Sequence, residues 1–189
     1  MRLLRVNRRF PVAGELMREI TVKVYAFSEL SDKAKDRARY ELKAAQGYPR
    51  QDEAIASLQA MAAHFDSTVA DYQVEFFDCS YSSATFSVPE MEAEEIARRL
   101  EDLGEYDPQT LKGKGEYRLT GVCSDEDIID GFRAAWHAGE RDLNKLLQAG
   151  FRTWLKAAQS DCESLYSNEV LAETCEANTW EFYEDGTQL

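Results

Sequence analysis

Carboxylate side chains are the residues of this chain whose number and spacing most clearly suggest a chemical role. The 189 residues carry a formal net charge of -13. Residues 1–50 contain 12 Lys and Arg against 6 Asp and Glu, so residues 51–189 contain 10 basic and 29 acidic side chains. Residues 161–189 contain eight carboxylates and no Lys or Arg. Such a surface repels nucleic acid and attracts a basic groove of the kind that binds nucleic acid.

The densest carboxylates are predicted on one helix, where side chains four residues apart lie about 6 Å from each other. Successive phosphates of a DNA strand have a similar spacing, since they rise by about 3.4 Å per step along the axis and by more along the backbone. We therefore predict a partner-binding face formed by Glu90, Glu94, Glu95, Glu101 and Asp102. Alternative contacts are the C-terminal carboxylates, Asp125, Glu126, Asp130, and Tyr183 as an exposed aromatic residue. The competing interpretation, that the acidity serves only solubility, stays open.

Patterns that could support catalysis are incomplete. Ser residues cluster between positions 80 and 87, but no Gly-x-Ser-x-Gly motif surrounds them. Cys79 could meet a His only through the fold, and we expect both His64 and His137 to be structural. Residues 113–115 lack the spacing of a phosphate-binding loop. The sequence therefore predicts no catalytic residues and no enzyme.

Metal ions, cofactors and membranes are not predicted as partners either. Neither His lies at zinc-ligand spacing from a Cys, and the carboxylate runs lack the Asp/Asn and Gly pattern of a calcium loop. No apolar run is long enough to span a membrane, and no apolar stretch of a secretory signal follows the basic N-terminus. Four Cys without a Cys-x-x-Cys pair favour reduced thiols in a cytoplasmic protein: Cys79, Cys123, Cys162 and Cys175.

Periodicity indicates the elements that must position these carboxylates. Alternating apolar residues predict a strand over residues 20–27. A helix over 33–45 follows, capped by Ser31 and ended by Gly47. We predict a cap formed by Ser124 and Asp127 at the start of a later helix. Further helices are predicted over 52–65, 90–103, from 124 to about 139, 140–166 and 169–176, and further strands over 70–78, 81–88, 115–122 and 178–183.

This order of elements disfavours a doubly wound parallel sheet, because the strands are not each followed by one crossover helix. We predict an α+β fold, with a mostly antiparallel sheet of about five strands and helices packed on it. Gly150 inside a predicted helix marks a bend or a close helix contact. Residues 1–19 are Arg-rich and lack a clear period, so we predict a basic N-terminal arm or extension over 1–19 and a single domain over 20–189.

Two segments carry a resemblance to a known group. Residues 20–39, ITVKVYAFSELSDKAKDRAR, resemble the start of small phage and prophage proteins that carry an antitoxin-like label, and similar proteins occur near phage counter-defence genes. Residues 176–186, EANTWEFYEDG, resemble the final strand and turn of the same group. A further match at 78–86 departs from it, with Ser and Tyr where relatives have Gly-rich acidic residues. The resemblance implies a phage or mobile-element origin and transfers no functional residues.

Charge and resemblance together favour an inhibitor of the anti-CRISPR type. Its expected partner is a host defence complex with a basic nucleic-acid-binding groove, in the cytoplasm of the host bacterial cell, and no direct contact with nucleic acid is expected. The alternative is an antitoxin that binds and neutralises a toxin protein and touches DNA through residues 1–50. A small enzyme is the least favoured hypothesis.

Overall fold

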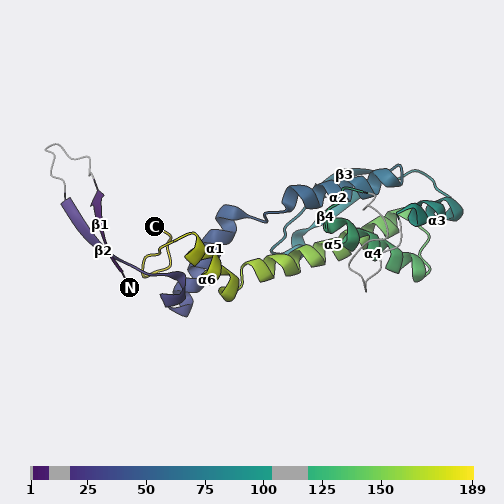
Figure 1. Cartoon of the computed structure of the whole chain (residues 1–189). Helices are drawn as coiled ribbons and strands as arrows, with labels where there is room; N and C mark the ends of the chain where they lie inside the picture. Colours follow the sequence, from purple (N-terminus) through teal and green to yellow (C-terminus); the bar gives the residue numbers. More distant parts are fainter. Residues whose placement is uncertain (1, 9–17, 104–118) are drawn as a thin grey trace, which may run out of the picture. The chain divides into compact units, whose positions relative to one another are not determined.

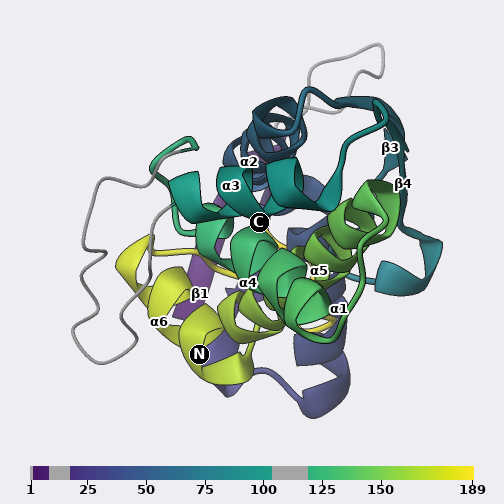
Figure 2. The same ribbon diagram turned by 90° about the vertical axis from the view of Figure 1, so that its right-hand side faces the viewer.

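The computed structural model describes residues 2–8, 18–103 and 119–189 of the chain. The chain divides into two compact units. The terminal unit comprises Met1–Gly47 and Glu163–Leu189, and the central unit comprises Tyr48–Cys162. Figure 1 labels the helices and strands, and Figure 2 shows the same ribbon turned by 90°.

Two antiparallel strands open the terminal unit. β1 (Arg2–Arg8) pairs with β2 (Arg18–Val24). β2 overlaps the first predicted strand, whereas β1 lies within the residues predicted as a basic arm. The predicted division into an arm over 1–19 and one domain over 20–189 stays a prediction, because residues 9–17 lie outside the described part of the chain.

The helical part of the terminal unit begins with a short 3-10 helix, η1 (Phe27–Glu29), followed by α1 (Asp32–Gln46). The hydroxyl of Ser31 accepts a hydrogen bond from the backbone N–H of Ala34 at 3.3 Å, which satisfies one free donor of the first turn of α1. Gly47 ends the helix with a φ of 63°, a conformation that glycine adopts without steric cost. The cap and the end predicted for this helix are confirmed.

The second helix of the terminal unit, α6 (Asn168–Ala177), ends in a Schellman motif. The backbone N–H of Thr179 donates to the Glu176 carbonyl at 3.0 Å, and that of Trp180 donates to the Cys175 carbonyl at 2.8 Å. The motif holds Thr179 at a φ of 54°, in the left-handed region that β-branched residues rarely adopt. This helix end therefore contains a strained residue at the position that glycine usually occupies.

The C-terminal residues return to the start of the terminal unit. Tyr25 and Phe182 exchange two backbone hydrogen bonds of 2.9 and 3.0 Å. The buried ring of Phe182 packs edge-on against Phe27, with 5.9 Å between ring centroids. A Cβ at Gly186 would lie 2.1 Å from the Ala34 carbonyl oxygen, so only glycine fits there. The two segments that carry the resemblance are therefore packed together in one unit.

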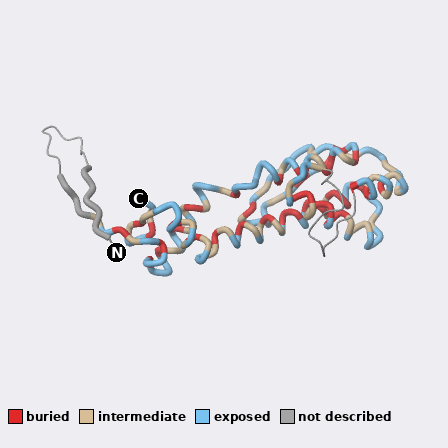
Figure 3. Tube along the Cα trace, viewed as in Figure 1, coloured by how far each residue is buried: buried red, intermediate tan, exposed pale blue. Residues whose placement is uncertain are grey.

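Three helices supply most of the core of the central unit: α2 (Gln51–His64), α4 (Ser124–His137) and α5 (Leu143–Leu165). Apolar residues at intervals of three and four place one face of each helix inward. The rings of Phe65 and Phe132 stack at 4.7 Å between centroids, and neither ring is accessible to solvent. Figure 3 shows the buried residues in red along these helices.

Two glycines allow α4 and α5 to approach each other closely. A Cβ at Gly150 would lie 2.8 Å from the carbonyl oxygen of Ile128, and a Cβ at Gly131 would lie 2.6 Å from the Cβ of Thr153. Both distances are shorter than real side-chain contacts allow. The close helix contact predicted at Gly150 is confirmed.

The remaining described elements of the central unit are a hairpin and a short helix. β3 (Thr68–Gln73) pairs antiparallel with β4 (Ser83–Ser87), as predicted, but both strands are shorter than expected. The connection between them contains a second 3-10 helix, η2 (Cys79–Tyr81), in place of a two-residue turn. α3 (Ala93–Asp102) starts three residues after the predicted position.

The predicted five-stranded sheet is wrong. The described residues are mainly helical, with six α-helices and two separate two-stranded antiparallel sheets, β1–β2 and β3–β4. Each described strand pairs only with its neighbour along the chain, so hairpin formation satisfies its hydrogen bonds locally. The apolar faces of the helices build the core. The short alternating runs in the sequence therefore did not indicate a sheet that all strands share.

Two other predicted elements also differ. The strand predicted over 178–183 contributes a bridge at Phe182 and no continuous strand. Part of the strand predicted over 115–122 lies outside the described residues, and residues 119–122 form bends. The cap predicted from Ser124 and Asp127 is wrong, because α4 starts without a side-chain cap hydrogen bond.

Candidate protein-binding surface

Three of the predicted contact residues are exposed carboxylates around α3. Glu90 lies in the segment between β4 and α3, and Glu94 and Glu101 lie on α3 itself. The two helical residues are seven positions apart, which is close to two full turns, so they share one face. No ion pair joins these three side chains to a basic residue in the described ranges. We call Glu90, Glu94 and Glu101 the α3 carboxylate face.

Glu95 and Asp102, also predicted as contacts, are instead held by arginines of the same helix. Glu95 accepts hydrogen bonds from Arg98 at 2.7 Å and from Arg99 at 2.7 Å. These two guanidinium groups lower the pKa of Glu95 to about 2. Asp102 lies 3.3 Å from Arg98. Their charges are therefore partly neutralised within the molecule, which weakens their value as contacts.

Arg99 also joins α3 to the end of α2. Its guanidinium donates to the carboxylate of Asp66 at 2.5 Å and to the carbonyl of His64 at 2.8 Å. In return, the His64 Nε2–H donates to the Arg99 carbonyl at 2.7 Å. Glu95 completes this set, which we call the α2–α3 clasp: His64, Asp66, Glu95 and Arg99. Glu95 therefore helps to hold α3 in place, and sequence spacing alone gave no sign of the partner in α2.

Asp125 is not available to a partner, because its side chain is fully buried. Its two carboxylate oxygens accept hydrogen bonds from the backbone N–H groups of Thr120 and Gly121, at 2.9 and 2.8 Å, and from the Thr120 hydroxyl at 2.8 Å. The Thr120 hydroxyl in turn lies 3.1 Å from that of Ser57 on α2. Asp125 thus fixes the segment that enters α4 and is removed from the proposed contact set.

The other two predicted contacts on α4, Glu126 and Asp130, lie at the surface beside Asp127. Asp127 is half-buried, and this burial, together with the nearby charges of Glu126, Asp130 and Asp161, raises the pKa of Asp127 to about 6. The group formed by Glu126, Asp127, Asp130 and Asp161 is called here the α4 carboxylate cluster. Mutual repulsion in this cluster favours a partner that brings positive charge.

Asp161 differs from the rest of this cluster because it has local partners. The Tyr48 hydroxyl donates to its carboxylate at 3.0 Å. The guanidinium of Arg50 lies 3.7 Å from the same oxygen. Burial and the hydrogen bond to Asp161 raise the pKa of Tyr48 above its usual range. The surface that remains most strongly acidic in the cluster is therefore at Glu126 and Asp130.

The remaining candidate residues do not join this surface. Tyr183 belongs to the terminal unit and is only partly exposed. His64 is held in the α2–α3 clasp, and His137 is exposed at the last residue of α4. Cys123, Cys162 and Cys175 are not in disulfide bonds in the described part of the chain. Within residues 2–8, 18–103 and 119–189, no group of three or more potential ligands could hold a metal ion.

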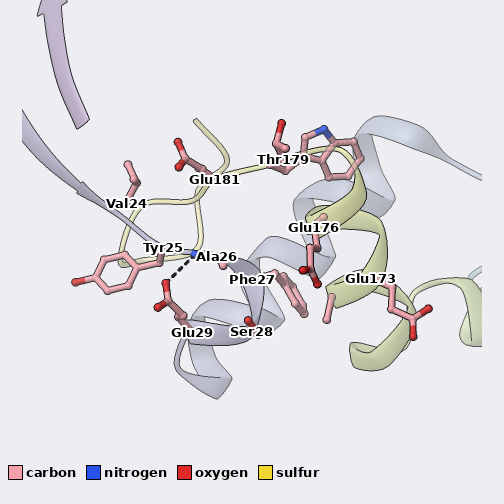
Figure 4. A pocket seen from close by; sticks show the side chains of 13 residues that line it. Val24, Tyr25, Ala26, Phe27, Ser28, Glu29, Glu173, Glu176, Thr179 and Glu181 are labelled. Atoms are coloured by element: carbon pink, nitrogen blue, oxygen red, sulfur yellow. Dashed lines mark hydrogen bonds between the residues drawn. The ribbon is translucent and has the colours of Figure 1, made fainter. Parts of the chain in front are cut away.

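The terminal unit contains a hollow of about 510 Å³ that the sequence patterns did not reveal. Two segments far apart in the chain line it, residues 24–29 and residues 172–181 (Figure 4). One sequence feature could have pointed to this hollow. No Lys or Arg follows residue 160, so the carboxylates of α6 have no basic neighbours in the sequence. Nothing in the sequence indicated that these carboxylates lie beside Phe27.

Comparison with known proteins assigns neither a family nor a function to this chain. No family model matches the chain, and no curated protein or solved structure matches it. In the described part of the chain, every helix is too short or too polar to cross a membrane.

Proposed function

We propose that this protein is an inhibitor of the anti-CRISPR type, encoded by a phage or mobile element, that occupies the basic nucleic-acid-binding groove of a host defence complex. The α3 carboxylate face and the exposed part of the α4 carboxylate cluster form its contact surface. The protein acts by binding, in the cytoplasm of the host bacterial cell, and the proposal requires no catalytic step, cofactor or metal ion.

The distribution of charge between the two units supports this proposal. The central unit contains 11 Lys and Arg against 22 Asp and Glu, a formal charge of -11 out of the total of -13. The terminal unit carries the remaining -2, because its acidic C-terminal segment is offset by basic residues before Gly47. A field of one sign concentrated on one unit steers it toward a surface of the opposite sign.

The observation that carries the proposal is the exposure of Glu90, Glu94 and Glu101 without an ion pair to a described basic residue. In the same helix, Glu95 and Asp102 are paired with arginines, so α3 separates carboxylates that stabilise its own position from carboxylates left to solvent. The contact set is therefore reduced from the predicted one. Its members are Glu90, Glu94, Glu101, Glu126 and Asp130.

Competition with nucleic acid tests the proposal. The protein is used to capture a partner from host lysate, and the purified partner is then offered labelled duplex DNA or RNA with and without this protein. We expect mutually exclusive binding, and we expect the complex to weaken between about 0.1 and 0.5 M salt, since the Debye length shortens from about 10 Å. A partner that binds nucleic acid and this protein together contradicts the proposal. Specific DNA binding by the isolated protein, combined with a toxin as partner, favours the antitoxin alternative.

A further inference from the structure

The hollow of the terminal unit has an apolar floor and an acidic rim. Val24, Phe27 and Cys175 are at most 2% exposed and form the floor. Burial raises the pKa of Cys175 to about 11, so its thiol stays neutral and contributes apolar surface. Among the residues that the structure describes, the rim carries four carboxylates and no Lys, Arg or His: Glu29, Glu173, Glu176 and Glu181.

Figure 4 shows how the labelled side chains are placed around this hollow. Glu176 lies beside the ring of Phe27, and Glu173 extends outward from the same helix. Glu29 lies on the other lining segment, residues 24–29. Its carboxylate is held in place by a hydrogen bond that it accepts from the backbone N–H of Ala26 at 3.1 Å. Glu173 and Glu176 are both exposed on α6, three residues apart, and no described basic side chain forms an ion pair with either.

A strained backbone holds one edge of the hollow. Thr179 and Trp180 line it, and both belong to the Schellman motif that ends α6. The left-handed conformation of Thr179 turns the chain so that Trp180 and Glu181 follow the hollow instead of continuing the helix. Aromatic and carboxylate groups are thereby brought next to each other on one side of the site.

We infer that this hollow binds the side chain of an arginine residue presented by a protein partner. The volume lies within the range of about 300–1,000 Å³ found for small-molecule sites. A guanidinium is weakly hydrated, stacks on aromatic surfaces and pairs with carboxylates, and its aliphatic stem packs on apolar residues. Trp180, which is partly exposed, supplies the aromatic surface that a guanidinium can contact above the buried floor, and Glu173 and Glu176 supply the opposite charge.

The site is independent of the surface proposed on the central unit. The described lining residues all belong to the terminal unit, so the hollow can bind arginine whether or not the α3 carboxylate face meets a basic groove. The acidic surface of the central unit attracts a partner through many charges. The hollow would instead recognise a single residue by its shape and its charge.

Titration with blocked amino acids followed by ¹⁵N–¹H correlation spectra tests this inference. The probes are Nα-acetyl-arginine N-methylamide and its neutral isostere, Nα-acetyl-citrulline N-methylamide. We expect the arginine probe to shift the amide signals of Phe27, Glu176 and Trp180, and the citrulline probe to leave them unchanged. Equal shifts with citrulline, or with Nα-acetyl-lysine N-methylamide, overturn the assignment to a guanidinium.

Paired variants separate the site from general acidity. The double variant Glu173→Gln with Glu176→Gln removes two rim charges, and we expect it to weaken arginine binding by at least about threefold. The control double variant Glu169→Gln with Glu184→Gln removes the same charge at exposed residues outside the hollow, and we expect no change. Equal weakening in both variants overturns the inference. Failure of the groove proposal would leave these results unaffected, because none of these residues lies in the central unit.

Discussion

Asp125 shows how a buried carboxylate can be structural, and among the described residues it is the only Asp or Glu that is buried. It accepts two backbone and one hydroxyl hydrogen bond from Thr120 and Gly121. We expect Asp125→Asn to lower the free energy of unfolding by about 1–3 kcal/mol, because an amide cannot accept all of these bonds and directs N–H groups at other donors. Urea unfolding measures this change. The control is Glu126→Gln, one residue away and partly exposed, for which we expect less than about 0.5 kcal/mol; equal losses would contradict the structural role of Asp125.

The backbone conformation of Thr179 lowers the stability of the folded protein. Its φ of 54° is costly for a β-branched side chain and free of steric cost for glycine. We expect Thr179→Gly to raise the free energy of unfolding by about 0.5–1 kcal/mol, measured by thermal or urea unfolding. Thr179→Ala is the matched control, since it also loses the hydroxyl bond to the Asn178 carbonyl but keeps a Cβ. A gain of the same size in the alanine variant would show that strain is not the cause.

The sequence predicted the roles of residues more successfully where their interactions are with near neighbours in the chain. Ser31 and Gly47 bound α1 as predicted, because capping depends on residues within one turn. The sequence did not reveal that Asp125 is buried, since its hydrogen bonds go to the upstream residues Thr120 and Gly121, whose conformation no pattern indicates. The acidic run from 125 to 130 therefore looked uniformly exposed, although it contains one structural residue and two surface residues.

At the scale of elements, the α2–α3 clasp depends on ionised Glu95. The pKa of Glu95 is lowered to about 2 in the folded protein by Arg98 and Arg99, from 4.5 as the ordinary value. Its stabilising contribution is therefore complete above about pH 4.5 and is lost as the pH falls toward 2. We expect the difference in unfolding free energy between the wild type and Glu95→Gln to shrink over this interval.

Glu94→Gln is the control for the clasp, because Glu94 lies on the same helix and makes no ion pair with a described basic residue. Urea unfolding at several pH values provides the measurement for both variants. A difference between wild type and Glu95→Gln that stays constant from about pH 6 to pH 2 would contradict the clasp. A pH-dependent difference of the same size for Glu94→Gln would assign the effect to general charge.

The α4 carboxylate cluster has the opposite dependence on pH. Because the folded pKa of Asp127 is about 6, against 3.8 as the ordinary value, the folded protein binds the extra proton between these values and loses stability as the pH rises through them. We expect Asp127→Asn to stabilise the protein at pH 7 by about 1 kcal/mol, since solvent screening of this half-buried group reduces the full value of about 1.4 kcal/mol per pKa unit. The gain should vanish near pH 3.5. A gain that is independent of pH would contradict the raised pKa that burial and the neighbouring carboxylates give Asp127.

The sequence predicted helices whose apolar pattern extends over several turns. It did not predict which strands pair with each other. All six α-helices lie within or close to predicted ranges, because their apolar faces extend over several turns. The prediction of a shared five-stranded sheet was wrong, because runs of six to nine residues do not specify which strand they pair with. Phe182 illustrates this: it forms isolated bridges with Tyr25 and Gln188 and belongs to no continuous strand.

At the scale of the whole molecule, charge is divided between the two units. The central unit carries -11 and contains the α3 carboxylate face, whereas the terminal unit is close to neutral. The sequence located the strongly acidic part after residue 50, but it could not separate carboxylates paired within the molecule from those left to solvent. That separation depends on Arg98, Arg99 and their neighbours in the fold.

The most direct test of the central claim reverses charge on the α3 carboxylate face. The dissociation constant for the captured partner is measured by calorimetry for the wild type, for Glu94→Lys with Glu101→Lys, and for Glu169→Lys with Glu184→Lys, which has the same net charge. We expect the α3 variant to bind at least about tenfold more weakly and the control to stay within about twofold of wild type. Equal affinities of the two variants would contradict a docking role for α3.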